Sequence, residues 1–382
     1  MKIVHLAMQH RPDDTRITLK EAVSLQKAGH KVWVVTSSRC SKDAKNQYDG
    51  VSILILSRIG KSRIGRSYRY LKTVLDAILE IQPDIIHIHE PFLLFLSPIL
   101  KRPGMYLVYD SHEDTPRNLV ANILHFKGKL RIVEKIVEKI VEKIENYFVK
   151  KVDAVIGATP IITDKLRRVQ SVAITIHNYP RLEEMQRSSS RLNNQNRICY
   201  AGGISLMRGI VQMVEVMPLV SARLSLAGDL PQVLKAKLQQ IDGWDKIDVH
   251  GFVGRDQIAQ IYQESVAGLV LLQPVTFYME SLPIKMFEYM MAGLPVIASN
   301  FPLWRDIIVE NECGFCVDPK NLKSIAQAIQ YLLENRLEAE RMGINGRKLV
   351  REKFNWNEEE KKLVSFYFMI ERDLDSKHML SS

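Results

Sequence analysis

Two carboxylates and a lysine lie within one short stretch, and their types suit the binding of a phosphorylated sugar. Glu280 and Glu288 are eight residues apart, and Lys285 lies three residues before Glu288. Residues three apart share a helix face, so Lys285 and Glu288 are expected side by side. The lysine suits a phosphate and the carboxylate suits a pair of hydroxyls. By spacing alone, an ordinary amphipathic helix with exposed charges explains the stretch equally well.

The residues around these charges predict a short helix that begins just after Glu280. Ser281 is a favourable N-cap, and Pro283 is tolerated in a first helical turn. Gly293 is a common stop just after a helix. We therefore expect a helix from about Leu282 to Ala292, with free N–H groups at Ser281 and Leu282 available to a diphosphate.

A second candidate phosphate site follows a predicted strand at residues 198–201. Gly202 and Gly203 end this strand, and Arg208 opens the next segment. A guanidinium matches phosphate oxygens in a bidentate way, so Arg208 is a candidate clamp for a diphosphate. The two glycines alone equally fit a plain turn between a strand and a helix.

Polar residues also follow strands in the first half of the chain. Asp14 and Arg16 come after the first strand, and His112 follows a later strand beside acidic neighbours. His87 and His89 also end a strand, and we rank them below His112. A single histidine is more often structural, but the carboxyl edge of a parallel sheet is where ligands bind.

The elements that position these residues alternate between β-branched runs and amphipathic helices, which is typical of doubly wound parallel α/β sheets. A polar interval at residues 187–196 separates two such series and is expected to be a linker. The length of 382 residues also suggests two domains. Strands are expected at 3–7, 32–35, 52–56, 85–88, 106–109 and 154–156, and then at 198–201, 224–227, 247–249, 268–272 and 295–298.

The stretch from Glu280 to Val296 resembles the Glu-x7-Glu signature of family 4 of the retaining glycosyltransferases, which have the GT-B fold. The resemblance covers nearly the whole chain. It implies two Rossmann-like domains at 1–186 and 197–354 with an interdomain cleft, and a C-terminal helix at 355–371 that packs back on the first domain.

The resemblance also implies roles for individual residues. Glu288 is expected to bind ribose hydroxyls, and Glu280 and His112 to lie near the donor sugar as catalytic residues. The family often has an arginine after the first glycine of the loop at 202, where this chain has Gly203, and Lys285 is expected to supply the missing phosphate contact. Asp14 and Arg16 resemble a subgroup with Asp-Thr-Arg-Ile and are assigned to the acceptor side.

The function implied is sugar transfer with retention of configuration from a nucleotide-sugar donor, without a metal or another cofactor. The expected acceptor is a glycan or lipid-linked saccharide in surface polysaccharide biosynthesis. The net charge of +10 favours anionic partners, including an anionic membrane. We find neither a signal peptide nor a membrane-spanning run, so the expected location is the cytoplasm, with peripheral contact at the inner face of the cytoplasmic membrane.

Several alternatives stay open at this point. A sugar-nucleotide epimerase or a phosphorylase of the same fold would use a similar site. A non-catalytic protein that binds a membrane or nucleic acid would explain the charge, although the basic residues are scattered and nucleic acid is not an expected partner. The Ile-Val-Glu-Lys repeat at 132–143 is either a surface helix or a membrane-facing one. Cys313 and Cys316 resemble a redox pair, but their context favours two small apolar residues near a loop.

Overall fold

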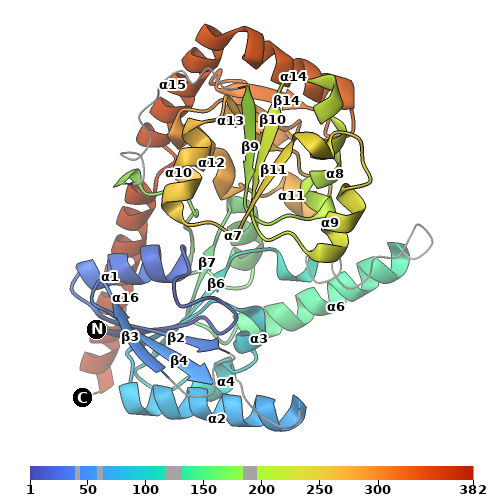
Figure 1. Cartoon of the computed structure of the whole chain (residues 1–382). Coiled ribbons are helices and arrows are strands. Elements are labelled where there is room, and N and C mark those ends of the chain that lie inside the picture. Colours follow the sequence, from blue (N-terminus) through green and yellow to red (C-terminus); the bar gives the residue numbers. More distant parts are fainter. Residues whose placement is uncertain (39–43, 58–62, 118–130, 184–195, 382) are drawn as a thin grey trace. The chain divides into compact units, whose positions relative to one another are not determined.

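The computed structural model describes residues 1–38, 44–57, 63–117, 131–183 and 196–381. The predicted linker, except Asn196, lies outside these ranges. The chain divides into two compact units (Figure 1). The first comprises Met1–Asn178 and Glu359–Ser382, and the second comprises Tyr179–Glu358.

The first unit is built on an eight-stranded sheet that is parallel except for one edge strand. β1 lies between β2 and β5, and the edge strand β3 runs antiparallel to β4. The strands in spatial order are β3 (Ala44–Tyr48), β4 (Val51–Ser57), β2 (Lys31–Ser38), β1 (Lys2–Leu6), β5 (Ile85–Ile88), β6 (Tyr106–Ser111), β7 (Ala154–Gly157) and β8 (Ala173–Thr175). The six predicted strands are confirmed, with ends shifted by a few residues. β3 and β8 were not predicted, because β3 is polar and exposed and β8 is only three residues long.

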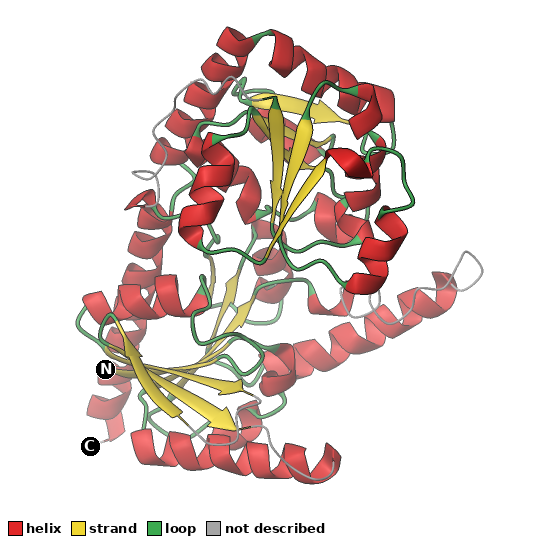
Figure 2. Cartoon of the chain, in the orientation of Figure 1, coloured by secondary structure: helices red, strands yellow, loops and turns green. Residues whose placement is uncertain are grey.

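Helices connect these strands and cover the sheet (Figure 2). The segment from Ile17 to Lys27 is a π-helix followed by an α-helix, and the chain turns at Gly29. The helices of this unit are η1 (Ile17–Ala22), α1 (Val23–Lys27), α2 (Arg63–Ile81), α3 (Pro91–Leu94), α4 (Ser97–Leu100), α6 (Arg131–Val149) and α7 (Pro160–Arg167).

The second unit has a six-stranded sheet, and its pairings are all parallel. The strands in spatial order are β11 (Ile247–Gly251), β10 (Arg223–Ala227), β9 (Arg197–Ala201), β12 (Ala267–Val270), β13 (Val296–Ser299) and β14 (Gly314–Val317). The connecting helices are η3 (Leu206–Arg208), α8 (Ile210–Glu215), η4 (Met217–Leu219), α9 (Gln232–Leu238), η5 (Trp244–Lys246), α10 (Arg255–Gln263), α11 (Thr276–Met279), α12 (Ile284–Ala292), α13 (Pro302–Ile308), α14 (Leu322–Glu334) and α15 (Arg336–Glu352).

Both sheets reverse their strand order beside the first strand of the unit. In the first unit this point lies between β1 and β5, and in the second it lies between β9 and β12. In doubly wound sheets, ligands bind outside the carboxyl ends of the strands at such a switch point. The loops after β1, β5 and β9 are therefore the places to search for a site.

The last helix, α16 (Trp356–Ser381), returns the chain to the first unit. It buries Leu363, Phe366, Tyr367 and Ile370. The first unit ends at Asn178 and not near residue 186, because Tyr179 packs edge-on against Phe287 and Phe354 of the second unit.

The repeat region forms α6, whose amino-terminal half extends beyond the sheet of the first unit (Figure 1). Ile136 and Ile140, the isoleucines of the second and third repeats, are each 52% exposed and face outwards, and Ile144, which follows the repeats, is 42% exposed. Across the described ranges, no helix is both long enough and apolar enough to cross a membrane.

Candidate functional site

In the second unit, the predicted phosphate-binding residues converge at the carboxyl end of β9. Gly202 follows the strand with a φ of +127°, a conformation that glycine adopts far more readily than other residues. A Cβ at this position would lie 2.9 Å from the Lys285 Nζ atom. A Cβ at Gly203 would lie 3.6 Å from the Arg208 guanidinium carbon. The glycine loop, the lysine and the arginine therefore share one location at the switch point.

Lys285 is buried at this location, and within the described ranges it forms no ion pair with a carboxylate. Its side chain rises from the second residue of α12 and is 4% exposed. The Nζ atom lies 3.8 Å from the centre of the Tyr200 ring and has no hydrogen-bond partner among the described residues. Burial, together with the nearby Arg208 charge, holds the pKa of Lys285 well below its usual value. Buried amines are usually paired with an anion or a hydrogen-bond acceptor, so Lys285 is a candidate for binding an anionic group.

Glu288 lies one turn further along α12 and belongs to a polar group of its own. Its Oε1 atom accepts a hydrogen bond from the Arg255 guanidinium at 3.0 Å, and its Oε2 atom accepts one from the Tyr262 hydroxyl at 3.4 Å. Sequence analysis did not single out Arg255 or Tyr262. Both come from α10, a helix without a recognised motif.

The start of α12 differs from the prediction. The helix begins at Ile284 with Pro283 as its N-cap, and not at Leu282. The residue before a proline is disfavoured in helical conformation, so Leu282 cannot open the helix. Ser281 does not cap the helix: its hydroxyl donates to the Tyr278 carbonyl at 3.0 Å. The predicted N–H groups at Ser281 and Leu282 are thus replaced by those at the start of α12 itself.

Glu280 lies at the junction between two short helices. It is the C-cap of α11 and is partly exposed. The next residue is held firmly, because the Trp304 indole donates to the Ser281 carbonyl at 2.7 Å. Glu280 therefore lies in a turn that this hydrogen bond holds in place, just before α12, the helix that carries Lys285.

In the first unit, Asp14 and Arg16 lie in different surroundings and make different contacts. Asp14 accepts hydrogen bonds from the backbone N–H groups of Arg16 and Ile17, both at 2.9 Å, and also contacts His10 at 3.0 Å. It is partly exposed at the end of the loop after β1. Burial raises the pKa of Asp14, but these hydrogen bonds outweigh it and leave the pKa below its usual value.

Arg16 does not occupy the acceptor-facing position that was expected of it. Its guanidinium is 5% exposed and donates to Asp110 at 3.0 Å and to the Ile176 carbonyl at 2.9 Å. It also lies 2.9 Å from Glu21. A guanidinium enclosed by two carboxylates and a carbonyl holds the interior of the unit together.

His112 borders this interior network. Its Nε2 atom lies 3.1 Å from the Asp110 carboxylate and 3.1 Å from the His89 ring. Its side chain is 19% exposed, so it joins the buried polar residues to the surface. His89, His87 and the previously unnoticed His5 stack behind it, with ring centres 4.3 to 5.1 Å apart.

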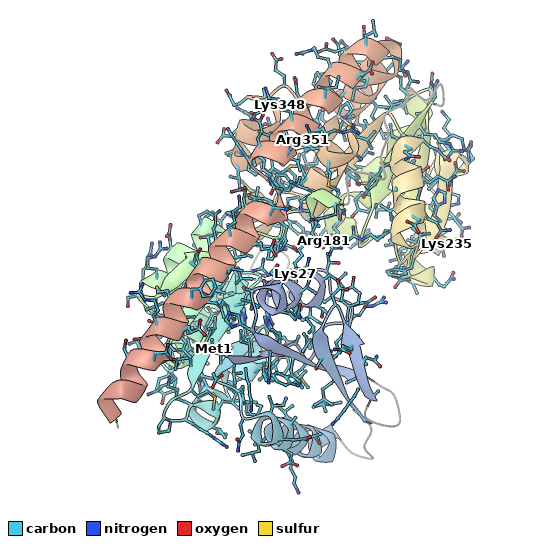
Figure 3. The ribbon with its side chains drawn as sticks, turned by 90° about the vertical axis from the view of Figure 1, so that its left-hand side faces the viewer. Met1, Lys27, Arg181, Lys235, Lys348 and Arg351 are labelled. Atoms are coloured by element: carbon cyan, nitrogen blue, oxygen red, sulfur yellow. The ribbon has the colours of Figure 1, made fainter. Side chains whose placement is uncertain are left out.

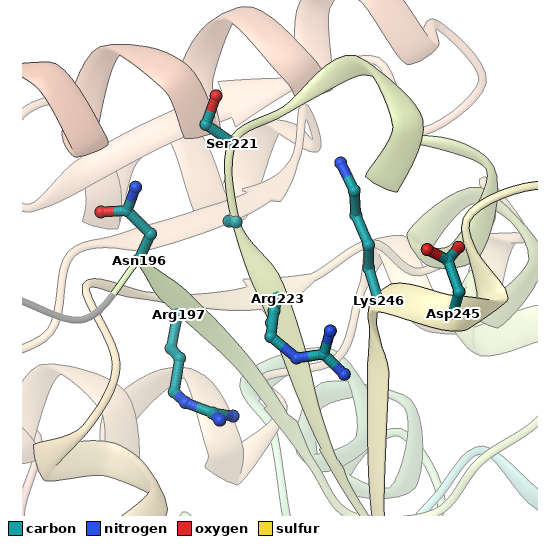
Figure 4. A pocket seen from close by; sticks show the side chains of 7 residues that line it. Asn196, Arg197, Ser221, Arg223, Asp245 and Lys246 are labelled. Atoms are coloured by element: carbon teal, nitrogen blue, oxygen red, sulfur yellow. The ribbon is translucent and has the colours of Figure 1, made fainter.

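Other features lie away from these edges. A hollow of about 640 Å³ is lined by residues at the amino ends of β9 and β10, at the opposite edge of the sheet from Gly202 (Figure 4). The basic side chains labelled in Figure 3 are distributed over the chain: Lys27 lies on α1, Lys235 on α9, and Lys348 and Arg351 on α15, whereas Arg181 lies between β8 and β9. Cys313 and Cys316 are free thiols, and burial raises their pKa to about 12 and about 11, which does not suit a reactive redox pair.

Comparison with known proteins agrees with this architecture. Residues 182–349 match the family described as glycosyl transferases group 1, and residues 15–178 match glycosyltransferase family 4. An uncharacterized glycosyltransferase of Methanocaldococcus jannaschii is 29% identical over 188 residues, which is 48% of this chain and 47% of that relative. The matched region thus spans about half the length of that relative.

Solved structures share the fold over nearly the whole chain. Sucrose-phosphate synthase from Thermosynechococcus elongatus has a TM-score of 0.76 at 18% identity, with 97% of this chain and 99% of that chain covered. HepE of Anabaena in complex with UDP-glucose has a TM-score of 0.73 at 13% identity, with 97% and 100% covered. With two family matches in succession and these shared folds, the chain belongs to the group 1 glycosyltransferases and has the GT-B fold.

Proposed function

We propose that the protein transfers a sugar from a nucleotide-sugar donor to an acceptor hydroxyl, and that the second unit binds the donor. The observation that carries this proposal is the buried Lys285 amine beside Gly202 and Arg208 at the switch point of the sheet. A donor diphosphate would supply the anion that this lysine lacks. HepE, which shares the fold, was solved with UDP-glucose, and this supports a nucleotide sugar as the donor class.

Each residue of the donor site has a proposed role. Lys285 and Arg208 bind the diphosphate, while the bare backbone at Gly203 lets it approach closely. Glu288, held by Arg255 and Tyr262, accepts hydrogen bonds from the two ribose hydroxyls. Glu280 lies towards the donor sugar. Ser281 and Leu282, which do not offer free helical N–H groups, shape the turn before α12.

The proposed mechanism is transfer with retention of configuration and without a divalent metal at the diphosphate. As the glycosidic bond breaks, negative charge accumulates on the leaving diphosphate, and the two cationic side chains stabilise it. Since these cations take the place that a metal ion has in other enzymes, the step proceeds without one. The leaving phosphate oxygen accepts the proton of the acceptor hydroxyl.

In the first unit, we propose that His112 and Asp14 contact the transferred sugar and the acceptor. Both are accessible side chains at the carboxyl edge of that sheet. The acceptor class that we propose is a glycan or lipid-linked saccharide of surface polysaccharide biosynthesis, used at the inner face of the cytoplasmic membrane. The net charge of +10 supports peripheral contact with an anionic lipid surface.

The test is calorimetric binding of UDP, GDP, ADP and CMP to the native protein and to Glu288→Ala. We expect one nucleotide to bind, and the variant to bind it roughly 10- to 150-fold more weakly, since hydrogen bonds to a charged group contribute about 1.5–3 kcal/mol. Glu334→Ala, on the exposed end of α14, is the matched control. Folded native protein that binds none of the four nucleotides would overturn the proposal.

Turnover with the matching nucleotide sugar then separates transfer from its rivals. Release of nucleotide that requires an added acceptor indicates transfer, whereas a changed sugar without an acceptor indicates an epimerase. NMR of the product linkage reports retention or inversion. Undiminished turnover in EDTA would support the metal-free mechanism, and turnover by folded protein that depends on added Mg²⁺ or Mn²⁺ would contradict it.

A further inference from the structure

The interior of the first unit contains a second group of chemically capable side chains, which the proposed transfer reaction does not use. His5 lies on β1, His87 and His89 lie at the end of β5, and Glu21 lies on η1. All four residues are at most 3% exposed. One nitrogen or oxygen atom from each lies within 4.8 Å of the corresponding atoms of the others.

Several atoms of this group face inwards without hydrogen-bond partners. In the described part of the chain, the Nε2 atoms of His5 and His87 and both carboxylate oxygens of Glu21 lack one. The Glu21 Oε1 atom has an ion-pair contact with Arg16 at 2.9 Å, and its Oε2 atom lies 4.0 Å from the His89 Nε2 atom. The His89 Nε2 atom lies 2.9 Å from the His5 Nδ1 atom, a contact that an ion bound by His89 would replace. Buried polar atoms are nearly always paired in folded proteins, so the Nε2 atoms of His5 and His87 and the Glu21 Oε2 atom indicate a ligand at this place.

The fold brings these side chains together by strand register and by an unusual helix. His5 is directly opposite His87 in the parallel pair of β1 and β5, and alternation along the chain places His89 on the same side. Glu21 comes from a π-helix, in which its N–H group donates to the Arg16 carbonyl at 2.9 Å, five residues back. π-Helical turns are uncommon and occur frequently at functional sites.

Other ionisable side chains border the group. The Arg16 guanidinium lies 2.9 Å from Glu21 and 3.0 Å from Asp110. Asp110 in turn lies 3.8 Å from the His87 Nε2 atom and 3.5 Å from the His89 Nδ1 atom. The carboxylates of Glu21 and Asp110 therefore both lie beside the imidazoles.

Outer contacts hold two of the histidines in position. The Tyr367 hydroxyl lies 2.7 Å from the Nδ1 atom of His87, which leaves the Nε2 atom to face the group. The Nδ1 atom of His89 lies 3.1 Å from His112 and 3.5 Å from Asp110. Histidine ligands of metals are characteristically oriented by such a contact at the other ring nitrogen.

We propose that His5, His87, His89 and Glu21 bind a divalent transition-metal ion of the zinc type. Three imidazoles and one carboxylate are a suitable tetrahedral set, and four protein ligands make a closed site with a structural role. Ligand atoms around tetrahedral zinc are about 3.3 Å apart, so the side chains must draw together by up to roughly 1.5 Å. The ion would join β1, β5 and η1 beneath the loop that carries Asp14. It is separate from the donor diphosphate site, where no metal is proposed.

The test uses the full chain, freed of metal by a chelator and checked for folding by circular dichroism. It is then titrated with Zn²⁺ against a chromogenic chelator, and with Co²⁺ by visible absorption. We expect one equivalent of each ion to bind, tetrahedral cobalt bands and a higher melting temperature. Folded native protein that binds neither ion would overturn the proposal and leave a purely structural polar cluster.

Variants locate the ion. Glu21→Gln and His87→Gln should abolish stoichiometric binding, and Tyr367→Phe should weaken it by roughly 10- to 100-fold through loss of the outer contact. His250→Gln, an exposed histidine in the second unit, is the matched control and should bind normally. A rival group of His89, Asp110 and His112 also exists. Binding that survives in Glu21→Gln but is lost in His112→Gln would overturn the site proposed here. If the interior variants fail to fold, the cobalt titration of the native protein and of Tyr367→Phe decides.

Discussion

Lys285 combines two features that rarely occur together: its basic side chain is buried, and among the described residues its Nζ atom has neither a hydrogen-bond partner nor an ion pair. An unpaired buried amine destabilises a fold, and such groups persist where a ligand needs them. We therefore predict that Lys285→Met leaves the free energy of unfolding within about 1 kcal/mol of the native value. The same change should weaken nucleotide binding roughly 10- to 150-fold, because a charge-assisted contact contributes about 1.5–3 kcal/mol.

Calorimetric titration and thermal melting of Lys285→Met measure the two effects, with Lys348→Met as a control at an exposed position of α15. The prediction would be contradicted if Lys285→Met were strongly destabilised but its folded fraction bound nucleotide as tightly as the native protein. Lys285 would then stabilise the core and would not bind the ligand.

The lowered pKa of Lys285 also predicts proton uptake on binding. Burial, followed by the Arg208 charge, places the pKa of the folded protein well below the usual 10.5. A bound diphosphate counters both causes, so the amine should take up a proton as the nucleotide binds. Binding heats should therefore differ between buffers of different ionisation enthalpy at some pH below 10.5, in a series measured across that range, and the difference should vanish in Lys285→Met. Equal heats in all buffers would mean that the lysine is already charged.

The same pKa fixes the sign of the effect of pH on stability. Between the lowered pKa of the folded state and the usual value, the unfolded chain binds more protons at this site than the folded one. The contribution of Lys285 to the free energy of unfolding therefore rises with pH across that interval. It is most unfavourable below the folded-state pKa, where both states carry the proton but only the folded state buries it.

At the scale of elements, the turn after β9 must stay free of side chains. Gly202 has a φ of +127°, and a Cβ there would lie 2.9 Å from the Lys285 ammonium. We predict that Gly202→Ala destabilises the second unit by about 1–3 kcal/mol and abolishes nucleotide binding by displacing Lys285. Gly254→Ala is the control, because nothing lies within 4 Å of its Cβ position. Chemical denaturation and calorimetry measure both, and a stable variant that binds normally would contradict the prediction.

Local patterns predicted most elements but not the features that depend on distant contacts. The β-branched runs at β5 and β9 are sufficient to identify buried parallel strands, and glycine after α12 correctly marks its end. The start of α12 was misplaced because Pro283 restricts Leu282 more strongly than Ser281 favours a cap. His5 and Glu21 were missed because local sequence patterns do not predict what brings them together. The register between β1 and β5 positions His5, and a π-helical turn positions Glu21.

At the scale of the whole molecule, the chain order and the compact units do not coincide. The second unit is one continuous segment, Tyr179–Glu358, whereas the first is completed by the end of the chain. Residues of α16 fill the core of the first unit, and the Tyr367 hydroxyl reaches the buried His87 ring at 2.7 Å. The proposed donor site therefore draws its residues from a segment that can be complete before α16 is made, and the proposed metal site depends on the last helix.

This organisation predicts the outcome of truncation after Glu358. The shortened chain loses Leu363, Phe366, Tyr367 and Ile370 from the core of the first unit. Full burial of such side chains contributes roughly 1.5–3 kcal/mol each, so the first unit should lose most or all of its stability. Hydrogen exchange should accelerate across β1, β5 and β6, while β9, β12 and α12 stay protected. Nucleotide binding should persist in the truncated protein, because Lys285, Arg208 and Glu288 all belong to the second unit. Loss of nucleotide binding with the second unit still protected would mean that the first unit supplies part of the donor site.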